Sequence, residues 1–215
     1  MIAMSRASSE IGLPLACLAL VVIAGCSDVP KAPPRFQIDP RQAAAAAMKL
    51  YDKNGDGTLD AKELKASPPL LELLKNLQSR SPGHPDCLTA EDVSGRLNEW
   101  LKAPTILVPG TAMVYLDDKL LEGATVTYEP EPFLGPSYHC HQGQTNAVGM
   151  ARLDPEIEQY PGSIYVGLYR VRISKKVNGR ETLPARYNTE SELGREVATN
   201  IRDSRANGMF RLKSK

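Results

Sequence analysis

The sequence predicts an α+β protein of two domains, a helical domain followed by an all-β sandwich. Within residues 41–103, apolar side chains recur at helical spacing, most clearly at Leu70, Leu73, Leu74 and Leu77. After Pro104 the apolar period changes to two, as expected for strands that bury one face. Short strands separated by turn residues are typical of a β-sandwich. We therefore place the domain boundary near Pro104 and extend the sandwich over 104–215.

Composition is that of an ordinary globular protein with a packed core. Hydrophobic residues make up 42% of the 215 positions and charged residues 24%, so extensive disorder is not expected. Lys and Arg together number 26 against 25 Asp and Glu, which gives a net charge of +1. A chain so close to neutral lacks the long-range field that attracts nucleic acid, and we expect no nucleic-acid partner.

Residues 1–26 are expected to be an export signal. Arg6 supplies a positive charge, and the apolar run Ile11–Ala24 is shorter than the about 20 residues of a membrane-spanning helix but suits a signal-peptide core. The run ends in Ile23-Ala24-Gly25-Cys26, which resembles the bacterial lipobox. The resemblance implies that Cys26 becomes an acylated N-terminus and anchors a lipoprotein to a bacterial membrane, facing the periplasm or the exterior. The alternative is a plain secretory signal with an incidental cysteine.

Residues 27–40 are expected to form a tether between the lipid and the folded body, because prolines at positions 30, 33, 34 and 40 interrupt any apolar period. Of the four cysteines, Cys17 would leave with the signal and Cys26 would carry lipid. Cys87 and Cys140 would lie in a compartment that permits disulfides. They fall in different predicted domains, so a bridge would require a contact between the domains, and this alternative stays open.

Four helical segments are expected, at Arg41–Tyr51, Lys62–Ala66, Leu70–Leu77 and Thr89–Lys102. The first is alanine-rich, which favours helix strongly. Ser67-Pro68-Pro69 is expected to stop the second and separate it from the third. Thr89 is a candidate N-cap because Asp92 follows three residues later. The apolar face of the last segment would consist of Val93, Leu97, Trp100 and Leu101.

Four strands are expected in the second domain, at Thr111–Leu116, Ala124–Tyr128, Tyr165–Ser174 and Gly208–Lys213. Turns between strands are indicated by Asp117-Asp118, Pro161-Gly162 and Asn178-Gly179. In the third strand, apolar residues alternate with Arg170, Arg172 and Ser174, so one face would be solvated.

The strongest functional signal is the twelve-residue segment Asp52–Glu63, which resembles an EF-hand calcium loop at every ligand position. The candidate ligands are the side chains of Asp52, Asn54, Asp56, Asp60 and Glu63 and the backbone carbonyl of Thr58. Gly57 supports the sharp turn between them. Calcium takes six to eight oxygens, and this loop offers about seven, with Glu63 long enough to bind through both of its oxygens. Magnesium would use that bidentate glutamate poorly.

EF-hands usually pair, and aligning Leu88 with Leu59 places the partner loop at Ser81–Asp92. Its first, third and fifth positions are Ser81, Gly83 and Pro85, so it is interpreted as a metal-free remnant that completes a helical EF-hand pair over 41–103. A single site is expected to bind weakly, with a dissociation constant of about 10⁻⁴–10⁻³ M, and to be structural. A dockerin is the competing family, but a helix precedes Asp52 and no second loaded repeat follows.

The second half of the chain resembles the carboxypeptidase regulatory-like (transthyretin-like) β-sandwiches of bacterial surface lipoproteins. The matching stretches are Leu116–Val126, Gly167–Ser174 and Leu183–Asn188. Thr145–Gly149 departs from the family because it lacks an acidic turn, which argues against a second metal loop there. The resemblance implies a non-catalytic interaction module.

His139-Cys140-His141 is the one other motif with metal-ligand chemistry. If it were a strand, His139 and His141 would share one face and offer two ligands to zinc or copper, whereas consecutive residues alone cannot complete a tetrahedral site. An ordinary loop is the alternative interpretation.

The sequence contains no nucleophile elbow, zinc-protease helix or phosphate-binding glycine loop, so we expect no enzyme. The first hypothesis is a lipid-anchored, exported calcium-binding protein whose sandwich contacts an envelope protein or a glycan. The second is an accessory subunit of an envelope enzyme or transporter. A third is a catalytic protein that depends on His139 or His141.

Overall fold

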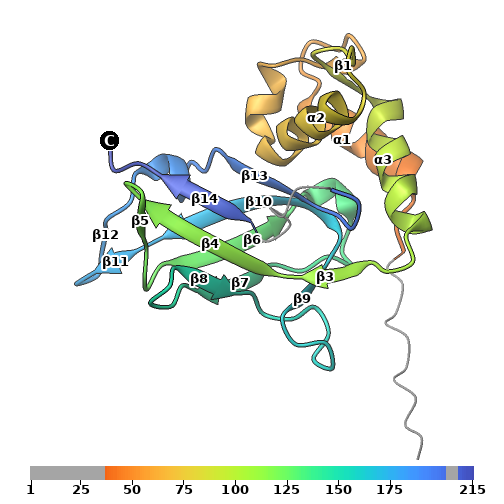
Figure 1. The fold of residues 1–215 in the computed structure, drawn as a ribbon. Helices are drawn as coiled ribbons and strands as arrows, with labels where there is room; N and C mark the ends of the chain where they lie inside the picture. Colours follow the sequence, from red (N-terminus) through yellow and green to blue (C-terminus); the bar gives the residue numbers. More distant parts are fainter. Residues whose placement is uncertain (1–36, 202–207) are drawn as a thin grey trace, which may run out of the picture. The chain divides into compact units, whose positions relative to one another are not determined.

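The structure is a computed structural model that describes residues 37–201 and 208–215. The predicted export signal, Cys26 and most of the predicted tether lie outside these ranges. All described residues belong to one compact unit of mixed α+β structure (Figure 1). No helix in the described ranges has both the length and the apolar character needed to cross a membrane.

Three α-helices and a short 3₁₀ helix form the first part of the described chain: α1 (Pro40–Tyr51), η1 (Glu63–Ala66), α2 (Pro68–Arg80) and α3 (Ala90–Lys102). Asp39 caps α1 by accepting from the backbone N–H groups of the following turn, so Pro40 begins the helix instead of ending the tether. The expected stop after Ala66 is confirmed, because Ser67 separates η1 from α2, but the two prolines do not belong to the break. Both prolines lie in the first turn of α2. Backbone N–H groups in the first turn make no hydrogen bond within the helix, so proline, which has no N–H, is tolerated there.

Helix α3 begins as predicted. The Thr89 hydroxyl accepts from the Asp92 backbone while the Asp92 carboxylate accepts from the Thr89 backbone, which completes a capping box. Val93, Leu97 and Trp100 are buried, so the predicted apolar face is confirmed for these three residues.

The remaining elements are strands and two further 3₁₀ helices. In chain order they are β1 (Thr58–Leu59), β2 (Leu88–Thr89), β3 (Leu107–Pro109), β4 (Thr111–Leu116), β5 (Lys119–Leu120), β6 (Thr125–Pro130), η2 (Pro132–Leu134), β7 (His141–Gln144), β8 (Met150–Arg152), β9 (Ser163–Tyr165), β10 (Gly167–Ser174), β11 (Lys176–Val177), β12 (Arg180–Glu181), η3 (Ala185–Tyr187), β13 (Leu193–Val197) and β14 (Met209–Leu212). All four predicted strands are present, and β4 has the predicted bounds.

Two larger sheets share a buried interior. One is antiparallel, in the order β13-β10-β6-β7, and the other joins β14, β4 and β5, with β8 also paired to β4. The ring of Tyr128 on β6 meets that of Phe210 on β14 edge-on, with centroids 6.4 Å apart, so the inner faces of the two sheets contact each other. The predicted turn at Asp117-Asp118 is confirmed, because both residues have positive φ between β4 and β5.

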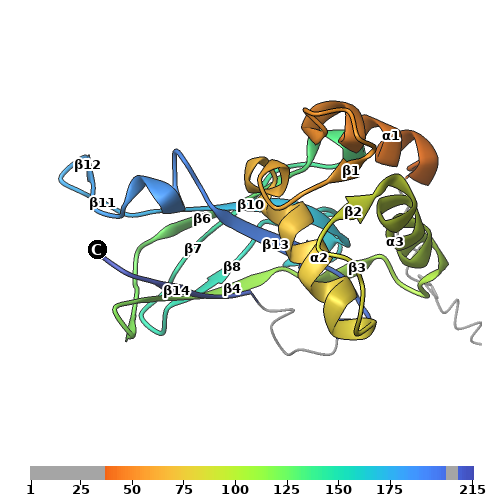
Figure 2. The same ribbon diagram turned by 90° about the horizontal axis from the view of Figure 1, so that it is seen from above.

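Helix α2 packs against β13 (Figure 2). The contact depends on a glycine, Gly194. A Cβ atom added to Gly194 would lie 2.1 Å from the carbonyl carbon of Pro68 and 2.3 Å from the nitrogen of Pro69. Backbone therefore meets backbone where the first turn of α2 crosses the strand, and no side chain fits between them.

We predict that Gly194→Ala destabilises the protein by about 1–3 kcal/mol, the usual cost of overpacking a rigid contact. The matched control is Gly95→Ala. Gly95 is exposed on α3 with nothing within 4 Å of the added Cβ, so alanine there should stabilise the helix by about 0.5–1 kcal/mol. Urea unfolding of both variants measures the two effects, and equal stabilities would contradict the contact.

Candidate functional site

The loop Asp52–Glu63 connects α1 to η1. Asp52 directly follows α1, and its backbone N–H donates to Met48 O at 2.8 Å, whereas Glu63 is the first residue of η1. Gly55 and Gly57 have φ of 74° and 83°, a conformation that favours glycine. The sharp turn predicted at Gly57 is therefore present.

Asp52 fixes the first half of the loop. Its Oδ1 accepts from Gly55 N at 2.6 Å and its Oδ2 from Gly57 N at 3.0 Å. Asn54 and Asp56 interact in the same turn, because Asn54 Oδ1 accepts from Asp56 N at 2.8 Å and Asn54 Nδ2 donates to Asp56 Oδ2 at 2.9 Å. The first three predicted side-chain ligands are thus brought together within one turn.

Asp56 also binds Thr58, and this affects its ionisation. The Thr58 hydroxyl and backbone N–H both donate to Asp56 Oδ1 at 2.8 Å. These hydrogen bonds, followed by the one from Asn54, hold the pKa of Asp56 below its ordinary value. The carboxylate is therefore anionic over a wider pH range, as a ligand for a hard cation must be.

Glu63 reaches back over the loop from its far end. Its Oε1 accepts from Lys53 N at 2.8 Å and its Oε2 from Asp60 N at 3.0 Å. Asp60 Oδ1 in turn accepts from the N–H groups of Lys62 and Glu63 at 2.7 and 2.9 Å, in the turn that leads into η1. The first predicted ligand, Asp52, thus binds backbone N–H groups later in the loop, and the last, Glu63, binds one near its start.

The donor set is the one that calcium prefers. Four carboxylates, one amide oxygen and one backbone carbonyl are all hard oxygen ligands, and the loop carries no imidazole or thiolate. As the side chains stand, their oxygens face N–H groups of the loop itself, and the described part of the chain contains no ready-made metal group of three or more His, Cys, Asp or Glu. Asn54 and Asp56 are exposed and Asp52, Asp60 and Glu63 half-buried, so all five have room to turn toward a cation.

The second loop pairs with the first at the predicted register. Strands β1 and β2 are antiparallel with Leu59 opposite Leu88, and both leucines are fully buried. The closing residue of the second loop, Asp92, is engaged by Thr89 and by His84, whose Nε2 lies 3.1 Å from Asp92 Oδ1. Contacts with the Pro85 carbonyl and then with Asp92 raise the pKa of His84.

A buried glutamate connects both ends of the candidate loop to the sheet. Glu131, between β6 and η2, accepts from the Tyr51 hydroxyl at 2.5 Å and from the Ser67 hydroxyl at 2.8 Å. Tyr51 directly precedes Asp52, and Ser67 directly follows η1. Burial raises the pKa of Glu131 above its ordinary value in spite of the two hydrogen bonds. Sequence reasoning missed these three residues, because no motif marks them.

A second buried polar group joins α3 to β13. Arg96 Nε forms an ion pair with Glu196, and the two side chains are 1% and 0% exposed. Asn76 Nδ2 on α2 donates to the other carboxylate oxygen of Glu196 at 2.6 Å, and Arg96 Nη2 donates to Asn200 Oδ1 at 2.9 Å. Helices α2 and α3 are therefore tied to β13 by hydrogen-bonded polar and charged groups.

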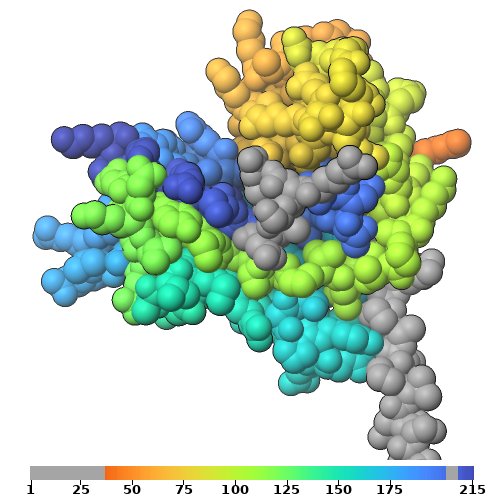
Figure 3. Space-filling view, in the orientation of Figure 1, coloured from red at the N-terminus to blue at the C-terminus, as the bar shows by residue number. Residues whose placement is uncertain are grey.

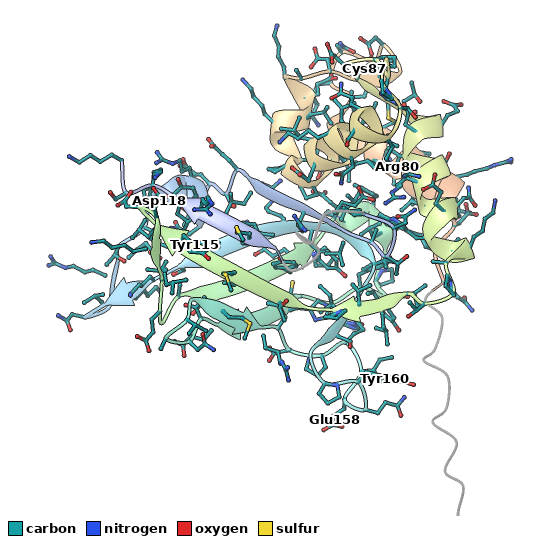
Figure 4. All side chains as sticks on the ribbon, viewed as in Figure 1. Arg80, Cys87, Tyr115, Asp118, Glu158 and Tyr160 are labelled. Carbon is teal, nitrogen blue, oxygen red and sulfur yellow. The ribbon has the colours of Figure 1, made fainter. Side chains whose placement is uncertain are left out.

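The remaining sequence candidates lie apart from the loop. Cys87, in the helical part (Figure 4), and Cys140 are both free thiols, so the bridge left open above is not formed. His139 is exposed and precedes β7, whereas His141 is buried and begins it, so the strand that was expected to carry both histidines contains only His141. Asn146 accepts from the N–H groups of Val148 and Met150 within a tight turn.

Comparison with protein-family models, curated protein sequences and solved structures returns no match to this chain. The functional assignment therefore rests on the residues and their geometry.

Proposed function

We propose that the protein binds one calcium ion in the loop Asp52–Glu63. The observation that supports this most is the position of Glu63, whose carboxylate already reaches the backbone of Lys53 across the loop. At the other end of the loop, the Asp52 carboxylate accepts a hydrogen bond from Gly57 N. The residues that would bind first and last in a calcium loop thus close one turn, as an EF-hand requires.

In this proposal each ligand has a distinct part. Asp52, Asn54 and Asp56 supply oxygens from the first turn, Thr58 supplies its carbonyl, and Asp60 binds directly or through water. Glu63 supplies both of its oxygens after leaving the N–H groups that it now accepts from. The four carboxylates repel one another without a cation, so calcium should tighten the loop.

The loop is best suited to a structural role. Tyr51 and Ser67, which flank the loop and η1, both donate hydrogen bonds to Glu131. A cation that rigidifies the loop would therefore also stabilise the packing of α1 and η1 against the sheet. We propose a non-catalytic EF-hand pair followed by a carboxypeptidase regulatory-like sandwich, in a lipid-anchored envelope protein that contacts another envelope protein or a glycan. An accessory subunit of an envelope enzyme or transporter and a dockerin-like adhesion module are the alternatives.

Calcium at millimolar concentration is expected to raise the melting temperature of the purified full-length protein, because it binds the folded loop and not the unfolded chain. Differential scanning calorimetry with and without calcium measures the rise. Magnesium at the same concentration should produce a smaller one, since its octahedral geometry uses a bidentate glutamate poorly. Superimposable curves in chelator and in calcium would count against the site.

For the anchor, Cys26→Ser is expected to move the protein from the membrane to the soluble fraction, because the acyl chains supply about 0.8 kcal/mol per buried methylene. Fractionation of cells that export the two forms measures the distribution, with Cys140→Ser as the control that stays with the membrane. Unchanged membrane association of Cys26→Ser would refute lipid anchoring.

A further inference from the structure

A cleft of about 600 Å³ lies on the outer face of the sheet β13-β10-β6-β7. That volume is within the usual range of ligand sites in proteins. Val126, Tyr128 and Val171 are buried inside the sandwich, so their neighbours along β6 and β10 face the cleft. No residue of the loop Asp52–Glu63 lines the cleft, which is therefore a separate site.

The floor of the cleft consists of two rows of polar side chains. Strand pairing sets residues of β10, β6 and β7 opposite one another, with Arg172, Thr127 and Gln142 in one row and Ser174, Thr125 and Gln144 in the other. Because both rows cross three strands in register, the side chains lie on one side of the sheet at the spacing of the strands. A ligand would thus meet a fixed grid of hydroxyl and amide groups.

The hairpin β11–β12 forms one wall of the cleft through Lys176 and Glu181. It protrudes past the end of the sheets in Figure 1, and its blue atoms stand clear of the green ones at the left of Figure 3. Glu181 ties the hairpin to the floor, because its Oε2 accepts from the Ser174 hydroxyl at 2.5 Å and its Oε1 from Leu183 N at 3.0 Å. The wall is therefore held in place before any ligand binds.

The charge of Arg172, at the centre of the sheet, is already neutralised within the protein. Its Nε donates to Glu129 Oε1 at 2.7 Å, and its Nη1 donates to the carbonyl oxygens of Asn188 and Thr189 at 2.5 and 3.1 Å. The positive charge that remains, Lys176, lies on the exposed hairpin opposite Glu181 in the pairing of β11 with β12. The cleft therefore favours a neutral ligand over an anion.

Several neutral groups of the floor are available to a ligand. Within the described part of the chain, no hydrogen bond engages the side chains of Thr125 and Gln144. Gln142 Nε2 donates to Thr127 Oγ1 at 3.3 Å, which leaves Gln142 Oε1 to accept. Hydroxyl and amide side chains both donate and accept hydrogen bonds. Sugar hydroxyl groups also do both, so each of these side chains can pair with a sugar in more than one way.

A polypeptide fits this cleft less well than a sugar. A peptide that adds a strand requires an unpaired sheet edge, whereas β10 and β6 each have a neighbour on both sides. At β7, a Cβ atom on Gly143 would lie 2.3 Å from the carbonyl oxygen of Arg152, so backbone already covers that strand there. Peptide helices dock in apolar grooves, and none of the described residues that line the cleft is aromatic or aliphatic.

We propose that the cleft on the outer face of β10, β6 and β7 binds a neutral oligosaccharide, with Thr125, Gln142 and Gln144 as its principal hydrogen-bonding residues. The proposal selects the glycan from the two kinds of partner named above, and so it rests on the proposed function of the sandwich as an interaction module. It does not depend on calcium, because the loop Asp52–Glu63 contributes nothing to the cleft.

The test is calorimetric titration of the full-length protein with maltohexaose, cellohexaose and chitohexaose, which differ in linkage and in the acetamido group. We expect at least one of the three to bind, at one site per chain. Thr125→Val and Gln144→Ala should each weaken that binding by about fivefold, the usual contribution of one neutral hydrogen bond. Valine suits a strand and Gln144 is exposed, so both variants should fold, and their melting temperatures check this.

Gln42→Ala is the matched control, because it removes an exposed glutamine from α1 and should leave the affinity for the sugar unchanged. Failure of all three sugars to bind, or binding that survives both cleft variants, would overturn the proposal. Tighter binding of hexagalacturonate than of any neutral sugar would contradict the neutral ligand class.

Unfolded β-casein is the polypeptide probe. If it bound to the cleft and the sugars did not, the partner would be a protein and the proposal would be wrong. Melting of the same samples in chelator and in calcium tests the loop Asp52–Glu63 separately. A protein that binds calcium but no sugar refutes only the cleft, and one that binds sugar but no calcium refutes only the loop.

Discussion

Replacing Arg96 by methionine is expected to destabilise the protein by about 3–5 kcal/mol, because it leaves the Glu196 carboxylate buried without its charged partner. Methionine keeps most of the apolar stem, so the loss reports the guanidinium and not a large cavity. Asn76 would still donate to Glu196, but one neutral hydrogen bond does not offset the desolvation of a buried anion. Urea unfolding at neutral pH measures the difference.

The double variant Arg96→Met/Glu196→Gln is the control that separates charge from packing. Glutamine retains an oxygen for the Asn76 amide and carries no charge, so most of the lost stability should return, as it does when buried ion pairs are replaced by neutral groups that pack well. If the single and double variants were equally unstable, the loss would lie in packing and the account of this ion pair would be wrong.

The second large effect concerns calcium. Glu63→Gln and Asp52→Ala are each expected to remove most of the calcium-induced rise in melting temperature. Glutamine keeps the length of Glu63 but cannot offer two anionic oxygens, and alanine at position 52 removes both a ligand and the hydrogen bonds to Gly55 and Gly57. Calorimetric melting in chelator and in calcium measures the rise for each variant.

The matched control is Asp86→Asn, an exposed acidic residue in the second loop. It removes one negative charge from the helical part without touching the proposed ligands, so the calcium-induced rise should persist. A rise that survived Glu63→Gln, or that vanished equally in Asp86→Asn, would mean that calcium acts through general charge neutralisation and not through the loop.

The sequence predicts the structure best where a short local pattern of residues is enough to specify it. The Thr89–Asp92 capping box, the strand Thr111–Leu116 and the pairing of Leu59 with Leu88 were all predicted, because caps, alternation and loop alignment leave local patterns. The six proposed calcium ligands fall on a single loop for the same reason. All six proposed ligands lie within twelve consecutive residues, so their spacing can be recognised without knowledge of the tertiary structure.

Elements whose stability comes from distant contacts were missed. Strand β7 has the sequence His-Gln-Gly-Gln, which shows no apolar alternation. Strand β13 contains Gly194, and a side chain at this position would clash with the backbone of Pro68 and Pro69. The prolines themselves were interpreted as a break, although Ser67 caps a helix that starts with them. Only the tertiary structure shows these dependences.

The buried charged residues were not predicted from the sequence either. Glu131, Arg96 and Glu196 would be placed in solvent by any local rule, yet each is nearly or fully buried because its partner comes from another layer. Spacing suggested that His139 and His141 lie in one strand, whereas β7 begins only at His141 and both histidines pair with Glu156 from the segment after β8.

The central claim is tested most directly by calorimetric titration of the full-length protein with calcium. One ion per chain, bound without cooperativity and with a dissociation constant of about 10⁻⁴–10⁻³ M, is the predicted result. A stoichiometry of two would show that the second loop also binds, and the absence of any binding heat together with an unchanged melting curve would contradict the calcium site itself.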